Sequence, residues 1–195
     1  MYVIKGNVIK ISVRSLVEFL CRTGDIDNRS GGMSDIKLMQ EGAKLHKKIQ
    51  KSMGAAYHAE VPLKIEIPKR VEDIDYLICL EGRADGIISN LSEDGEGNKE
   101  PLSEVTIDEI KTTQQDTEKL KEAVYVHKAQ AMCYGYIYMQ KHELEKISIQ
   151  MTYCNAETEK IKRFVQEYSR EELTEWFETL IDSFKLWSDF LFAER

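Results

Sequence analysis

The chain has 195 residues, of which 42% are hydrophobic and 31% charged, a balance typical of a globular domain and not of a disordered chain. Its apolar runs are too short for a membrane span and the N-terminus lacks the apolar core of a signal peptide, so we expect a cytoplasmic protein. The net charge of −7 argues against coating DNA by charge alone. It leaves a nuclease open, because local basic patches and bound cations offset an acidic average.

The N-terminal part predicts two helices, and residues 6–11 could add a short strand before them. Ser12 fits the N-cap of the first helix, in which apolar residues follow at helical spacing: Val13, Leu16, Val17 and Leu20. Residues 22–34 are rich in Gly, Asp, Asn and Ser and predict a loop. A second helix is expected from Asp35 to about Met53, with a buried stripe of Leu38, Gly42, Leu45, Ile49 and Met53.

The middle of the chain predicts strands. Residues 61–67 and 76–88 alternate between apolar and polar side chains, and residues 105–111 form a third β-type run. The polar segment 90–104 contains two glycines and a proline and predicts the loop between the second and third strands.

The next stretch predicts a helix and then further strands. Residues 116–140 should be helical, with one side formed by Leu120, Val124, His127, Ala131, Tyr134 and Tyr138. Residues 147–153 alternate as a fourth strand, and residues 161–165 could form a fifth.

A long terminal helix completes the chain. Ser169 and Glu172 have the spacing of a capping box. An apolar stripe follows, which packs either on the core of the domain or on a partner: Leu173, Phe177, Leu180, Phe184, Trp187 and Leu191. The order of elements predicts an α/β fold in one domain, residues 1–195, with a central mixed β-sheet flanked by helices.

Glu109 and Lys111 are the first candidates for a functional site, because side chains two apart on a strand point to the same face. A carboxylate among apolar residues is costly unless it is paired or binds a metal. A structural salt bridge is the alternative. Asp85, near the end of the preceding strand, is either a turn former or a second acid, whereas Asp108 faces the other way.

Two helical positions add polar groups that could serve the same site. His46 follows Gly42 by one turn, and a glycine there would let a substrate or another backbone approach. Gln130 and Tyr134 share a helix face with His127. They form either a half-buried polar stripe or an edge that contacts a nucleotide, with Tyr134 stacking or donating a hydrogen bond.

Four short motifs occur in a defined order: Gly42-x-x-x-His46, Gly82-Arg83-Ala84-Asp85, Glu109-Ile110-Lys111 and Gln130-x-x-x-Tyr134. Together they resemble the PD-(D/E)XK nuclease superfamily and specifically its RecB-like exonuclease branch. The resemblance spans about residues 36–154 and implies a restriction-endonuclease-like core. The helical Gln-x-x-x-Tyr motif is the part most specific to that branch.

The resemblance implies a role for each motif residue. His46, Asp85, Glu109 and the Ile110 carbonyl would bind Mg²⁺ or Mn²⁺, and Asp85, Glu109 and Lys111 would be catalytic. Gln130 and Tyr134 would shape the site and contact the DNA. Lysines on the second helix could guide the phosphate backbone inward: Lys44, Lys47 and Lys48.

The chain departs from the family pattern in two respects. The acid of the third motif is Glu109 where Asp is common. Many relatives also hold an iron–sulfur cluster on one early and three late cysteines. Here the cysteines are scattered and none follows Cys154, so no cluster is expected and small hydrophobic packing is their simpler role.

We therefore expect a metal-dependent deoxyribonuclease, an exonuclease of DNA repair or recombination that hydrolyses phosphodiester bonds with a metal-activated water. Two segments, 22–27 and 152–155, are also similar to the nuclease domain that precedes some bacterial DinG/XPD-like helicases. A helicase domain in the same or another chain is thus a candidate partner, besides DNA. The alternatives are a catalytically silent DNA-binding module, a nuclease that acts only within a larger helicase, and an RNA-directed nuclease.

Overall fold

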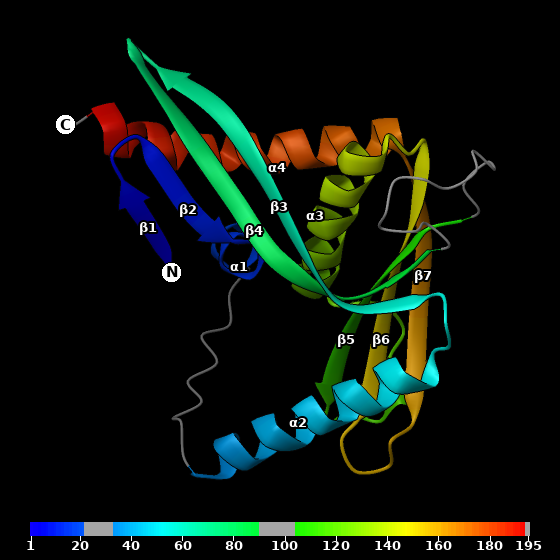
Figure 1. The fold of residues 1–195 in the computed structure, drawn as a ribbon. Helices are drawn as coiled ribbons and strands as arrows, with labels where there is room; N and C mark the ends of the chain where they lie inside the picture. The colour runs from blue at the N-terminus through cyan, green and yellow to red at the C-terminus, as the bar shows by residue number, and fades with distance from the viewer. Residues whose placement is uncertain (22–32, 90–103, 194–195) are drawn as a thin grey trace.

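The computed structural model describes residues 1–21, 33–89 and 104–193. Seven strands form one sheet in the order β1-β2-β4-β5-β6-β7, with β3 paired to β4 beside this path. Parallel and antiparallel pairs both occur, and helices cover the sheet (Figure 1). This arrangement confirms the predicted α/β class with a central mixed sheet and a long C-terminal helix. The predicted loops and the motif at 22–27 lie wholly or largely outside the described residues.

The N-terminal hairpin leads directly into the first helix. Strands β1 (Tyr2–Lys5) and β2 (Val8–Ser12) pair in antiparallel fashion, and α1 (Val13–Cys21) follows. The Ser15 backbone N–H donates to Ser12 Oγ at 3.0 Å, which confirms Ser12 as the N-cap. Only β2 was expected from the sequence.

Strands β3 (Tyr57–Val71) and β4 (Ile74–Ile88) form a long hairpin, and the two remaining parts of the sheet both pair with β4. One side of β4 pairs with β3 along its whole length. Its other side pairs first with β2, in parallel, and then with β5 over only three residue pairs, in antiparallel fashion. The pairing extends β3 well beyond the predicted residues 61–67, because strand length is decided by the partner as well as by alternation.

Strands β5 (Thr106–Thr113) and β6 (Lys146–Asn155) are parallel, and α3 (Tyr125–His142) crosses between them. The helix predicted from residue 116 is wrong in its first nine residues. Asp116 instead caps a 3₁₀ turn, η1 (Thr117–Lys119), by accepting the Glu118 N–H at 3.0 Å. The Val124 N–H donates to the Tyr153 hydroxyl at 2.9 Å, and Val124 is extended, so the helix starts only at the next residue, Tyr125.

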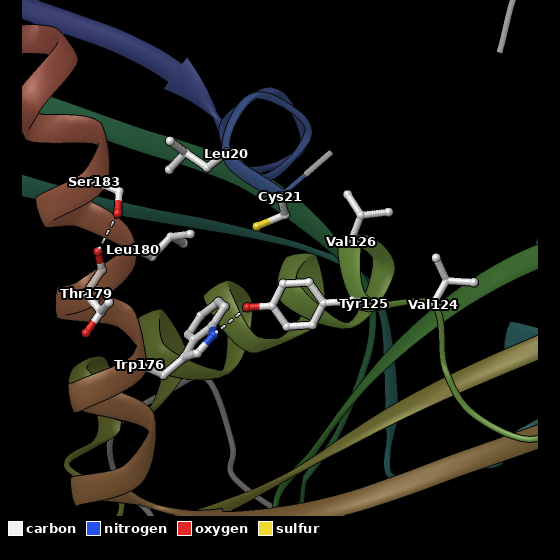
Figure 2. Close-up of a pocket in the computed structure, with 9 residues that line it drawn as sticks. All are labelled: Leu20, Cys21, Val124, Tyr125, Val126, Trp176, Thr179, Leu180 and Ser183. Carbon is white, nitrogen blue, oxygen red and sulfur yellow. Dashed lines mark hydrogen bonds between the residues drawn. The ribbon is translucent and has the colours of Figure 1, made fainter. Parts of the chain in front are cut away.

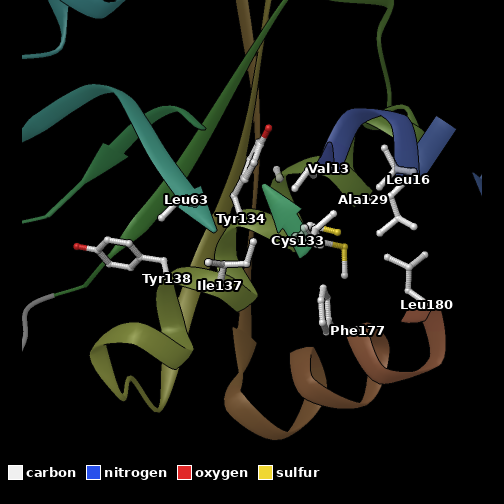
Figure 3. Packing of buried hydrophobic residues seen from close by; sticks show 14 of the residues in the cluster. Val13, Leu16, Leu63, Ala129, Cys133, Tyr134, Ile137, Tyr138, Phe177 and Leu180 are labelled. Atoms are coloured by element: carbon white, nitrogen blue, oxygen red, sulfur yellow. The ribbon is translucent and has the colours of Figure 1, made fainter. Parts of the chain in front are cut away.

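The edge strand β7 (Ile161–Ser169) and helix α4 (Arg170–Ala193) end the described chain. The capping box is confirmed: Glu172 N–H donates to Ser169 Oγ at 3.1 Å, and Ser169 N–H donates to Glu172 Oε2 at 2.9 Å. The first four stripe residues of α4 are buried against the core of this same chain, where Figure 3 shows two of them, Phe177 and Leu180, facing α1 and α3. No helix among the described residues is long and apolar enough to cross a membrane.

Helix α2 (Met33–Ser52) packs on β5 and β6 through a small separate cluster, whose buried members are Leu45, Ile49, Ile110 and Cys154. The predicted stripe of this helix is wrong at its start, because Leu38 is 44% exposed. Ile110 and Lys111 alternate on β5, so α2 lies on one face of the sheet while α3 covers the face of Glu109 and Lys111. The candidate site lies where these two layers and β4 meet.

Candidate active site

Glu109 and Lys111 lie side by side on β5, as their spacing predicts. The Lys111 Nζ is 3.7 Å from Glu109 Oε1 and donates to Gln130 Oε1 at 3.3 Å. Glu109 is only 2% exposed. The ammonium group is therefore held between a buried carboxylate and an amide from α3.

Asp85 belongs to the same site because β4 and β5 separate at its position. Their ladder ends at the pair Gly86 and Asp108, and beyond it the Asp85 carboxylate accepts the Ile110 backbone N–H at 2.7 Å. Asp85 would be opposite Glu109 if the register continued. The alternative that Asp85 forms a turn is wrong, because β4 continues through Ile88.

His46 approaches the acids from α2. Its Nδ1 is 3.9 Å from Asp85 Oδ1. A Cβ at Gly42, one turn earlier, would lie 3.3 Å from Thr112 Oγ1, so the missing side chain lets α2 approach the end of β5 closely. The structure thus brings His46, Asp85, Glu109 and Lys111 together from three elements.

Gln130 and Tyr134 form the α3 side of the site. Gln130 Nε2 donates to the Tyr134 hydroxyl at 3.5 Å, and Gly82 makes room for that hydroxyl, since a Cβ there would lie 2.6 Å from it. Tyr134 is 3% exposed, which argues against the expected stacking on a nucleotide. Its place is to hold Gln130, which in turn holds Lys111.

The electrostatics of the acid pair are unfavourable without a cation. Burial, and then the nearby Asp85 charge, raise the pKa of Glu109 well above its ordinary value, although Lys111 opposes this. Burial also raises the pKa of Asp85, against the Ile110 N–H, His46 and Lys111, which lower it. Within the described chain, Glu109 Oε2 is buried without a hydrogen-bond partner.

These observations fit a hard divalent cation, which takes carboxylate and carbonyl oxygens as ligands. Asp85, Glu109, the Ile110 carbonyl and His46 are the donors at hand. However, residues 1–21, 33–89 and 104–193 contain no group of three or more His, Cys, Asp or Glu side chains arranged to hold a metal ion. The site is therefore an acid pair with further oxygen and nitrogen donors nearby.

Two residues near the site were not singled out from the sequence. Gln50 Nε2 donates to the Asp85 carbonyl at 2.8 Å and to Glu60 Oε1 at 3.0 Å. Its position one helical turn after His46 on α2 is the sequence feature that could have identified it. Asp108 is fully buried on the opposite face, as expected. It accepts hydrogen bonds from Tyr57, Gln150 and Thr152, so it anchors β5.

A groove of about 690 Å³ opens beside the site, between α2 and the end of β5. His46, Thr112 and Arg14 are among the residues that line it. The expected DNA-guiding lysines of α2, Lys44, Lys47 and Lys48, are exposed, but Lys48 is paired with Glu159 at 2.6 Å.

A second hollow, of about 510 Å³, lies away from the acids between α1, α4 and the start of α3 (Figure 2). It is mainly apolar, and Trp176 Nε1 donates to the Tyr125 hydroxyl at 3.1 Å at its border. The four cysteines are free thiols, three of them buried, as their predicted packing role requires, while the expected absence of an iron–sulfur cluster stays a prediction.

Comparison with known proteins adds little to this geometry. No family model matches the chain, and no curated protein matches it. A solved structure described as the crystal structure of SSO0001 is similar over 92% of this chain and 77% of its own, with 20% sequence identity and a TM-score of 0.49. At that level the similarity carries no argument, and the fold class rests on the sheet itself.

Proposed function

We propose that this protein is a Mg²⁺- or Mn²⁺-dependent deoxyribonuclease, an exonuclease of DNA repair or recombination. The observation that carries the proposal is the buried Glu109 Oε2, which has no hydrogen-bond partner among the described residues and lies beside Asp85 and Lys111. A carboxylate that is buried next to a second acid is stabilised when a cation binds between them. A structural salt bridge with Lys111 alone would leave that oxygen without a hydrogen-bond partner among the described residues.

Asp85 and Glu109 would hold the cation, with His46 and the Ile110 carbonyl as further donors. When bound, such a cation neutralises charge on the phosphoryl group and lowers the pKa of water. Glu109 must lose its proton to act as a ligand, and its raised pKa makes that loss depend on the cation.

Lys111 would orient the attacking water and stabilise the negative charge that develops on the phosphoryl oxygens. The structure supports this role because Glu109 Oε1 and Gln130 Oε1 fix the ammonium group before substrate binds. Gln130 and Tyr134 are positioning residues in this scheme. The groove between α2 and β5, with Arg14 and the exposed Lys44 and Lys47 nearby, would receive the DNA.

The second candidate is a catalytically silent DNA-binding module. One observation favours it, namely that the described residues contain no three-residue metal cluster. Against it, both acids and the lysine are present on one site. A helicase domain as partner, and RNA as substrate, stay predictions from the sequence.

The test is single-turnover cleavage of end-labelled single- and double-stranded DNA, with Mn²⁺ and without it. Lys111→Ala should lower the rate roughly a hundredfold or more, the scale of comparable electrostatic deletions, while Mn²⁺ binding persists because an ammonium group is not a ligand. Lys64→Ala, on the exposed face of β3, is the matched control. Cleavage by Lys111→Ala at the wild-type rate would reduce Lys111 to a salt-bridge partner. A wild type that binds DNA and never cuts it would favour the silent module.

A further inference from the structure

A further cavity, of about 480 Å³, lies at the β7 edge of the sheet. Its walls come from β6, β7, the segment before α3 and the first turn of α3. We call it the lysine pocket, after the three lysines among its lining residues: Lys121, Lys128 and Lys162. None of the motifs above includes it.

The register of the sheet relates this pocket to the candidate active site. Lys111 is aligned with Tyr153 on β6, and Tyr153 with Lys162 on β7. Side chains aligned across neighbouring strands point to the same face, so Lys162 is on the face of Lys111. Two interstrand spacings separate their backbones by about 10 Å.

The charged side chains that line the pocket are mostly positive, with Arg163 in addition to the three lysines. Among the described residues none of its three lysines forms an ion pair, and Glu122 is the one acid among the lining residues. Lys128 Nζ donates to Gln166 Oε1 at 2.5 Å and lies 5.6 Å from the centre of the Tyr168 ring. In a protein of net charge −7, this local excess of cations calls for an anionic ligand.

The wall of the pocket also offers an aromatic ring. Lys162 Nζ lies 5.8 Å from the centre of the Phe164 ring, and Phe164 is aligned with Met151, the β6 neighbour of Glu109. Lysines beside aromatic rings are the combination that binds a nucleic acid strand, through phosphates and base faces respectively. A simple anion would make no use of the ring.

We propose that the lysine pocket binds the phosphate backbone of the nucleic acid substrate, two strands and about 10 Å across the sheet from the backbone of Lys111. Lys162 and Lys128 are the phosphate-binding residues, and they hold the strand in register with Lys111. This inference rests on the proposed nuclease function, because the pocket is assigned to substrate binding by its position relative to Lys111.

The experiment measures DNA affinity by fluorescence anisotropy at several salt concentrations, with Ca²⁺ in place of Mn²⁺. Each phosphate contact that is lost reduces the slope of log affinity against log salt by roughly 0.7 to 0.9. Lys162→Gln should show this reduction, and Lys162→Gln/Lys128→Gln about twice as much. Lys10→Gln is the matched control, because Lys10 is an exposed lysine of β2 that does not line the pocket and is separated from β7 by β4, β5 and β6.

Cleavage kinetics separate this proposal from the proposed function. In an active enzyme, Lys162→Gln should raise KM and leave kcat unchanged, as expected for a residue that binds substrate and transition state equally. If the wild type cleaves DNA and Lys162→Gln has the same salt slope as wild type and Lys10→Gln, the lysine pocket is refuted and the nuclease stands. If the wild type binds without cleaving and Lys162→Gln loses slope, the nuclease is refuted and the pocket stands. A wild type that binds no DNA refutes both.

Discussion

Glu109 is a carboxylate in a place where folded proteins rarely keep a charge. It is 2% exposed, one of its oxygens lacks a partner among the described residues, and a second acid lies nearby. Such a group is neutral, paired or bound to a cation. In the metal-free protein, the free-energy cost of burying this carboxylate should therefore lower the stability of the fold.

Glu109→Gln should therefore stabilise the metal-free protein, increasingly as the pH rises. Burial raises the pKa of Glu109 well above its ordinary value of 4.5. The folded state holds the proton more tightly than the unfolded state between these two pKa values, so the wild type loses stability as pH rises through that window. Glutamine does not titrate, so the gain should be absent below pH 4.5, reach its maximum above the raised pKa and then stay constant.

The measurement is the melting temperature in a chelator across this pH range. Glu175→Gln, at an exposed position of α4, is the control and should show no such trend. A Glu109→Gln variant that is less stable than wild type at neutral pH would mean that the charge is already compensated by Lys111.

A substitution at Gly82 tests whether Tyr134, through its contact with Gln130, positions Lys111. A Cβ at this position would lie 2.6 Å from the Tyr134 hydroxyl, so Gly82→Ala must displace the ring and weaken its contact with Gln130. We expect a loss of about 1–3 kcal/mol in stability, as for other overpacked sites, and slower cleavage. Gly82→Ala/Tyr134→Phe, which removes the crowded oxygen, should recover part of the stability. Unchanged melting and cleavage in Gly82→Ala would show that Tyr134 moves freely.

At the level of secondary structure, the site depends on the separation of β4 and β5. Their ladder has three residue pairs, and the Asp85 side chain takes the N–H of Ile110 where a backbone carbonyl would otherwise accept it. The opening between the strands gives both acids a common space. Helix α3 covers one side of it, and α2 supplies His46 from the other.

The capping box of α4 makes a separate prediction about an element that the chemistry does not use. Ser169→Ala removes the acceptor of the Glu172 N–H and should cost about 0.5–2 kcal/mol of stability. Ser183, in the interior of the same helix, donates only to the Thr179 carbonyl, so Ser183→Ala should be nearly neutral. Urea unfolding measures both. Equal losses in the two variants would show that the cap is not what stabilises this helix.

For the whole molecule, the main consequence of the site is that metal binding should be linked to folding. A cation that binds only the folded state adds about 2.7 kcal/mol at a concentration of 100 times Kd. Mn²⁺ or Mg²⁺ should raise the melting temperature of wild type, and Asp85→Ala should abolish the rise. Asp73→Ala, at the exposed tip of the β3–β4 hairpin, should keep it. No shift at millimolar Mn²⁺ would mean that the acid pair is not a metal site.

Local patterns in the sequence determined the type of most elements and the pairing of Glu109 with Lys111. The period of a strand or helix is set by backbone geometry, so it can be read from neighbouring residues. The same holds for the caps at Ser12 and Ser169, whose partners lie three residues away. The order of the four motifs also predicted which residues would meet, although not how.

Tertiary structure alone decided the rest. The start of α3 depends on the Tyr153 hydroxyl from β6, and the length of β3 depends on β4. The sequence named Asp85 as a candidate, but the way it joins the site was decided by β5, whose Ile110 N–H donates to it from 25 residues away. The alignment of Lys111 with Lys162 likewise arises from strand register. Contacts between distant residues depend on how the whole chain packs, and no local period encodes them.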